Sequence, residues 1–184
     1  MKAKLLVCAA GALALAACGS RTNENAPDET LATDTATPTE APAPAVTTAQ
    51  AFVDGAAASD AYEIEAGRLA QSMGTSQKVK DFGAMMVKDH TTSTTNLKDA
   101  AAQATGVTVN AQMTALQRND LEALRNAGTT FDTLYAQQQV AAHEQALNLL
   151  RDYAANGDSA PLKTFASKTV PVVEGHLTKA RDLP

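Results

Sequence analysis

The sequence predicts an all-α protein built from four long helices and one short one. Three observations lead to this prediction. No segment alternates apolar and polar residues as a half-buried strand does. Long stretches without proline each end at a glycine that is soon followed by a residue of the N-cap type. Apolar residues inside these stretches recur at helical spacing.

Glycines and N-cap residues divide residues 48–184 into helices. The glycines are Gly74, Gly106, Gly128 and Gly157, and the candidate caps after them are Thr75 or Ser76, Asn110, Thr129 or Thr130, and Asp158 or Ser159. Pro161 lies just inside the last start, where its missing N–H costs nothing. The expected helices are therefore about 49–73, 76–105, 111–127, 130–156 and 159–182.

Each long helix carries a stripe of core-type residues. The expected buried stripes are Phe52, Ala56, Glu63, Gly67 and Ala70; Val79, Phe82, Met86, His90 and Leu97; Val140, His143, Leu147, Leu150 and Ala154; and Leu162, Phe165, Thr169, Val172, His176 and Ala180. The first stripe consists mostly of small residues, which permit a close approach between helices.

Two bundle topologies fit these helices. The piece from Gly106 to Gly128 is long enough to travel the length of a bundle, about 40 Å for a 27-residue helix. A helix pair, a long crossover containing the short helix, and a second pair make the ferritin-like connectivity. A simple up-and-down bundle decorated by an extra helix is the competing topology.

The N-terminus has the features of an export signal. Lys2 and Lys4 precede an apolar run that is too short to span a membrane. The string Leu15-Ala16-Ala17-Cys18-Gly19 resembles the bacterial lipobox, in which the cysteine becomes the lipidated first residue. We therefore expect a lipoprotein signal peptide at 1–17 and a membrane anchor at Cys18. Gly19 after the cysteine favours the outer membrane, with the protein facing the periplasm.

We expect residues 18–47 to be a lipidated cysteine followed by a disordered tether. Their Pro, Thr, Ala and acidic residues bury too little apolar surface to offset the entropy of ordering. We expect the helical bundle domain to occupy 48–184. Cys8 leaves with the signal, so the mature domain has no free thiol for redox or metal chemistry. The net charge of −5 argues against a nucleic-acid partner.

The three histidines of the chain, His90, His143 and His176, each fall on the apolar stripe of a different long helix. With Glu63 from the first helix they could form one layer and hold a transition-metal ion. The alternative is that they are structural, with their imidazoles hydrogen-bonded to buried polar side chains. The possible partners are Glu63, Glu65, Tyr135 and Asp89. The methionines Met73, Met85, Met86 and Met113 are more typical of core packing than of a copper thioether site.

Several strings resemble a known family, the bacterial domain-of-unknown-function family 4142. They are Tyr62-Glu63-Ile64-Glu65-Ala66-Gly67-Arg68-Leu69-Ala70, Phe82-Gly83-Ala84-Met85-Met86-Val87-Lys88-Asp89-His90, Phe131-Asp132-Thr133-Leu134-Tyr135, Val140-Ala141-Ala142-His143-Glu144, and Phe165-Ala166-Ser167-Lys168-Thr169-Val170-Pro171 with His176-Leu177. The family comprises exported and outer-membrane proteins assigned to the ferritin-like superfamily. The resemblance thus implies the ferritin-like topology, and its patterned polar positions match Glu63, Asp89, His90, Asp132, His143 and His176.

The resemblance does not extend to a di-iron centre. Di-iron ferritins carry Glu-x-x-His on two helices, whereas Val87, Val140 and Val173 stand three residues before the histidines here. The family has no established reaction, and no hydrolase, P-loop, zincin or dinucleotide motif is present. No catalytic residue or substrate is therefore predicted, and the chain does not look like an enzyme. Two functions stay open: a metal-binding bundle, or an envelope or stress-associated interaction module with structural histidines and a protein partner that the sequence does not identify.

Overall fold

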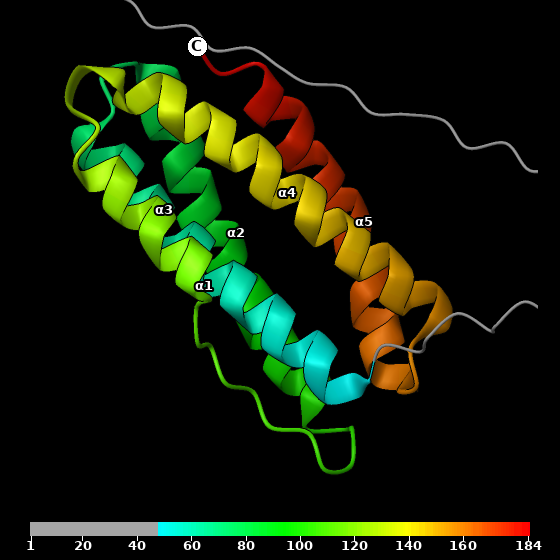
Figure 1. The fold of residues 1–184 in the computed structure, drawn as a ribbon. Coiled ribbons are helices and arrows are strands. Elements are labelled where there is room, and N and C mark those ends of the chain that lie inside the picture. Colours follow the sequence, from blue (N-terminus) through cyan, green and yellow to red (C-terminus); the bar gives the residue numbers. More distant parts are fainter. Residues whose placement is uncertain (1–47) are drawn as a thin grey trace, which may run out of the picture. The chain divides into compact units, whose positions relative to one another are not determined.

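The structure is a computed structural model, and it describes residues 48–184 (Figure 1). These residues form helices and contain no strand. The all-α prediction is confirmed. The elements are α1 (Ala49–Met73), α2 (Gln77–Ala101), α3 (Ala115–Arg125), the 3-10 turn η1 (Gly128–Thr130), α4 (Phe131–Asn156) and α5 (Ala160–Arg181). The predicted signal peptide at 1–17 and the tether at 18–47 lie outside the described residues. No described helix is both long and apolar enough to cross a membrane.

The long helices form two hairpins that pack face to face. α1 packs along α2, and α4 packs along α5; across the bundle α1 faces α4 and α2 faces α5. Figure 1 shows that α2 and α4 run in the same direction, because the chain returns along the bundle through residues 102–114 and α3 before α4 begins. The connection therefore runs along the bundle, and the competing up-and-down arrangement is not what this structure has.

The predicted helix ends hold at α1 and differ around the crossover. α2 ends at Ala101 rather than near 105, and α3 begins at Ala115 rather than 111. Thr114, not Asn110, is the N-cap of α3, because Thr114 and Gln117 exchange side-chain and backbone hydrogen bonds in a capping box. Gly106 has φ +74° and lies in the turn beyond α2 rather than at its end.

The α1–α2 hairpin is held at its turn by a side chain from α4. The two oxygens of Asp132 accept hydrogen bonds from the Thr75 backbone N at 2.9 Å, the Thr75 hydroxyl at 2.6 Å and the Ser76 backbone N at 2.8 Å. Further along this hairpin the helices are in close contact, as the small residues of α1 predicted. A Cβ added to Gly67 would lie 2.6 Å from the Gly83 carbonyl oxygen.

The apolar core has two parts with a polar layer between them. At one end Phe52, Tyr153 and Phe165 pack together, and at the other Phe82, Phe131 and Tyr135 do so. The expected stripes of α1 and α2 are buried.

On α5 the predicted stripe is wrong at one position. Val172 is 47% exposed and Val173 is buried instead. The reason is that Val172 lines a surface groove between α2 and α5, where the two helices do not close over it.

Candidate metal centre

Three histidines from three helices meet in the middle of the bundle. His90 on α2, His143 on α4 and His176 on α5 are each no more than 5% exposed. The His90 ring centroid lies 5.9 Å from that of His143 and 5.5 Å from that of His176, and the His143–His176 separation is also 5.5 Å. Each ring offers one ligand atom such that all three atoms lie within 4.8 Å of one another. The convergence predicted from the helical stripes is present.

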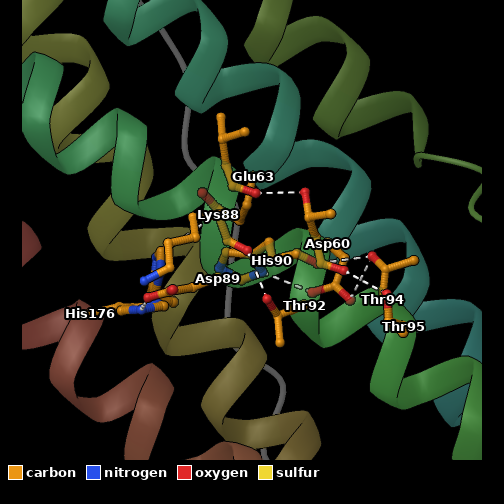
Figure 2. Close-up of polar contacts among 12 residues, drawn as sticks. Asp60, Glu63, Lys88, Asp89, His90, Thr92, Thr94, Thr95 and His176 are labelled. Carbon is orange, nitrogen blue, oxygen red and sulfur yellow. Dashed lines mark hydrogen bonds and ion pairs between the residues drawn. The ribbon is translucent and has the colours of Figure 1, made fainter.

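One nitrogen of each ring is held by an acceptor of the protein. His90 Nδ1 lies 2.8 Å from Asp60 Oδ1, and His176 Nε2 lies 3.1 Å from Asp89 Oδ2. His143 Nδ1 lies 2.8 Å from the backbone oxygen of Gln139. Figure 2 shows Asp60 of α1 next to His90 of α2, and Asp89 of α2 next to His176 of α5. Because a carbonyl oxygen only accepts, His143 carries its proton on Nδ1 when the ring is neutral.

The second nitrogen of each ring is buried and has no hydrogen-bond partner. These atoms are Nε2 of His90, Nε2 of His143 and Nδ1 of His176. A neutral ring that donates from one nitrogen presents a lone pair on the other. Hydrogen bonds from the outer nitrogen to carboxylate or carbonyl groups are the arrangement that orients metal-ligating histidines. When all three rings are neutral, they therefore provide three lone pairs that no protein group uses.

Burial keeps two of the imidazoles neutral. Burial and, to a smaller extent, the charge of the neighbouring His90 lower the pKa of His143 to about 4. Burial, together with the charges of His90 and His143, likewise lowers the pKa of His176 to about 4. For His90 burial acts in the same direction, but the hydrogen bond to Asp60 and the charge of Glu63 outweigh it and raise the pKa.

Glu63, predicted to join the histidines, lies behind one of them. Its Oε1 is 3.7 Å from Nδ1 of His143, the nitrogen that is bonded to the backbone, and the three-atom ligand set does not include it. The carboxyl group is 1% exposed, and burial raises its pKa to about 7. Neither Glu63 oxygen has a hydrogen-bond partner, and the same is true of the side-chain polar atoms of Gln139 and the hydroxyl of Tyr135.

The chain matches the model of a family described as "Domain of unknown function (DUF4142)" over residues 34–183. The chain belongs to this family. Among solved structures, "CopM in the Cu(II)-bound form" is similar with a TM-score of 0.65 and 15% sequence identity. The alignment covers 75% of this chain and 96% of that chain. This likeness shows a shared fold. Comparison with curated protein sequences finds no match.

In this DUF4142 chain the hydrogen-bond partners that the sequence predicted for the histidines are confirmed in part. Asp89 does bond His176, but Glu65 pairs with Arg68 at the surface. The main omission was Asp60, which is 4% exposed and bonds His90. Its signal was its position: Asp60 lies one helical turn before Glu63 on the small-residue face of the first helix.

Proposed function

We propose that the protein binds a transition-metal ion through His90, His143 and His176. One observation carries the proposal: in each ring one nitrogen is hydrogen-bonded to the protein, and the other is buried without a partner beside its two neighbours. The sequence-based set also contained Glu63, and we place Glu63 behind His143, where its carboxyl acts on the imidazole rather than on the ion.

Purely structural histidines account less well for this arrangement. Buried polar groups in native proteins almost always have a partner, and an unpartnered one costs about 1–3 kcal/mol. Three such nitrogens in one place therefore lower stability unless a ligand uses them. A metal ion bound only to the folded state restores that stability.

The ligand set favours the metals that imidazole suits, which are zinc, copper, iron and nickel. Three histidines leave a coordination position open, as in zinc sites that bind a further small ligand. The similar fold that is named in its Cu(II)-bound form makes copper(II) the first ion to test. We do not propose a di-iron centre, because the positions three residues before the histidines are valines.

We also assign the bundle to the ferritin-like class. The support is its connectivity: two helical hairpins joined by a connection that travels along the bundle and contains α3. For location we propose an outer-membrane lipoprotein that faces the periplasm, on the strength of the Leu15–Gly19 string. Mass spectrometry of the mature N-terminus decides this point, since a mature chain without acyl groups on Cys18 contradicts it.

Thermal melting with added zinc, copper(II) and iron(II) tests the metal site. We expect at least one ion to raise the unfolding temperature of the purified protein, because it binds the folded state alone. His143→Ala removes that rise, and Gln145→Ala, an exposed position on the same helix, retains it. Asp60→Asn leaves the ligands in place and weakens affinity by about 10–100-fold, as loss of an orienting hydrogen bond does.

The same thermal melting experiments also test the alternative function, in which the histidines are structural. If none of the three ions changes the unfolding temperature, the metal hypothesis is wrong and the envelope or stress-associated interaction module remains. In that case His143→Ala lowers the free energy of unfolding by about 1–3 kcal/mol, because the buried polar groups around Glu63 lose the imidazole beside them. Metal then has no effect before or after the substitution.

A further inference from the structure

A small cavity, partly open to solvent, lies against His90 and His176. Its volume is about 40 Å³, and side chains from all four long helices line it. Ala56 comes from α1, Leu149 and Leu150 from α4, and Val173 from α5. The atoms that face the cavity are almost all carbon. A space with such a carbon lining suits an apolar guest better than a polar one.

The charges around the cavity exclude ionic guests. Asp60 and Asp89 border it, but their oxygens are engaged by the imidazoles of His90 and His176. Their negative charge repels anions, and the carbon walls cannot replace the hydration shell of a cation. A volume of about 40 Å³ exceeds the roughly 10–15 Å³ that a cavity needs to hold one water molecule. The cavity therefore suits one small uncharged molecule.

Two surface grooves border the cavity. The groove between α2 and α5 shares Ser93, Thr169 and Val172 with it. The groove on the α1–α4 side, which α3 also borders, shares Ser59, Ala146 and Leu149. The cavity itself is partly open to solvent, so a small molecule can enter it without separation of the helices.

We propose that this cavity binds a small uncharged molecule of about the size of dioxygen and presents it to the ion held by the three histidines. The second half of this statement rests on the proposed metal site, whereas the first half concerns the cavity alone. The open coordination position of a three-histidine site is what such a molecule would occupy.

Xenon tests the cavity in the metal-free protein, because it is uncharged, apolar and similar in size. Under xenon pressure we expect the methyl NMR signals of Leu149, Leu150 and Val173 to shift. The methyl signals of Leu121 and Leu124, which are buried in the other part of the core, should stay in place. Unmoved signals at the cavity overturn the proposal.

Variants locate the xenon. Ala146→Leu fills the space from α4 and should abolish the shifts, whereas Ala142→Leu, one turn earlier and equally half-buried, lines the α1–α4 groove but not the cavity and should retain them. Leu150→Ala changes the volume in the opposite direction, so xenon should saturate the signals at lower pressure. Xenon shifts that are unaffected by both Ala146→Leu and Leu150→Ala contradict the assignment.

Carbon monoxide tests access to the ion. Added to the protein loaded with copper(I), it should give a carbon–oxygen stretching band in the infrared spectrum that Ala142→Leu retains and Ala146→Leu loses. A band of equal strength in both variants overturns the contact between cavity and ion. A protein that binds no metal at all refutes the proposed function, and the xenon shifts then still decide whether the cavity is a binding site.

Discussion

Two regions of the bundle, an aromatic end and a central polar layer, differ in whether their buried polar atoms have hydrogen-bond partners. The aromatic end consists of Phe52, Tyr153 and Phe165. Phe52 and Tyr153 stack with centroids 4.0 Å apart, and the Tyr153 hydroxyl donates to Asp158 at 2.8 Å. The central polar layer consists of Glu63, His90, Gln139, His143 and His176, together with the hydroxyl of Tyr135, whose ring belongs to the other aromatic cluster. Within residues 48–184 it holds all eight buried side-chain polar atoms that lack a hydrogen-bond partner.

This difference distinguishes a region that stabilises the fold from a region that is suited to bind a ligand. Tight aromatic packing with a satisfied hydroxyl contributes to folding free energy. A layer of unpartnered lone pairs and carboxylate oxygens lowers it, since each such group has lost water without gaining a partner. A region that lowers stability at the centre of the fold is the kind of place where a ligand site is expected, because natural proteins break packing rules mainly at functional sites.

The largest expected effect lies at the aromatic end. Phe52→Ala should lower the free energy of unfolding by about 3–5 kcal/mol, because a fully buried ring is lost from between Tyr153 and Phe165 and leaves a cavity. Denaturant unfolding followed by circular dichroism measures the change. Val172→Ala, at an exposed valine, is the control and should change stability by less than about 0.5 kcal/mol. A loss below about 1 kcal/mol for Phe52→Ala would show that this end does not stabilise the fold.

The parts of the fold that follow from helical periodicity were predictable. α1 has the predicted bounds, and the three histidines meet because each occupies the core-facing stripe of its helix. A stripe places a residue on a face with a tolerance of one or two positions, which is enough to bring large side chains together across a bundle.

The parts that depend on how helices turn relative to one another were not predictable. The exchange of Val172 for Val173 reflects the rotation of α5 about its axis and the groove beside α2. Asp60 was missed because an aspartate in a helix is usually exposed, and only the position of His90 on another helix shows that its carboxylate has a partner. The cap at Thr114 differs from the expected Asn110 because both residue types are good caps, and the reciprocal bond with Gln117 decides between them.

The second prediction concerns the central polar layer and has the opposite sign. Glu63→Met replaces two unpartnered oxygens by apolar atoms of similar bulk, so the metal-free protein should become more stable by about 1–3 kcal/mol. Denaturant unfolding of the chelator-treated protein measures this. Glu65→Met, at a carboxyl group paired with Arg68 on the surface, is the matched control and should have little effect. A fall in stability on Glu63→Met would mean that Glu63 has partners in solution, such as buried water.

The smallest expected effect comes from a carboxylate whose hydrogen bonds are complete. Asp132, unlike Glu63, accepts three hydrogen bonds at the start of α2 and lies near the positive end of that helix. The limited burial of Asp132 tends to raise its pKa, but the hydrogen bonds from Thr75 and Ser76 and the charge of Lys80 outweigh it and lower the pKa. The pKa values of the two acids thus shift in opposite directions from their ordinary values. That of Asp132 falls because N–H and O–H donors surround its carboxylate, and that of Glu63 rises because burial removes water from its carboxylate.

Asp132→Ala should lower the free energy of unfolding by about 1 kcal/mol at pH 7, a figure kept small because the carboxylate is partly exposed to water. A carboxyl whose pKa is lower in the folded state stabilises the protein fully above its unfolded value, about 3.9, and loses that contribution as the pH falls through the folded value. The difference between wild type and Asp132→Ala should therefore be constant from pH 7 to about 5 and shrink in more acidic solution. Asp99→Ala, at an exposed aspartate on α2, serves as the control for the removal of one carboxylate from the surface. Denaturant unfolding at a series of pH values measures both variants, and a difference that grows on acidification would mean that the Asp132 carboxylate does not stabilise the turn through its charged form.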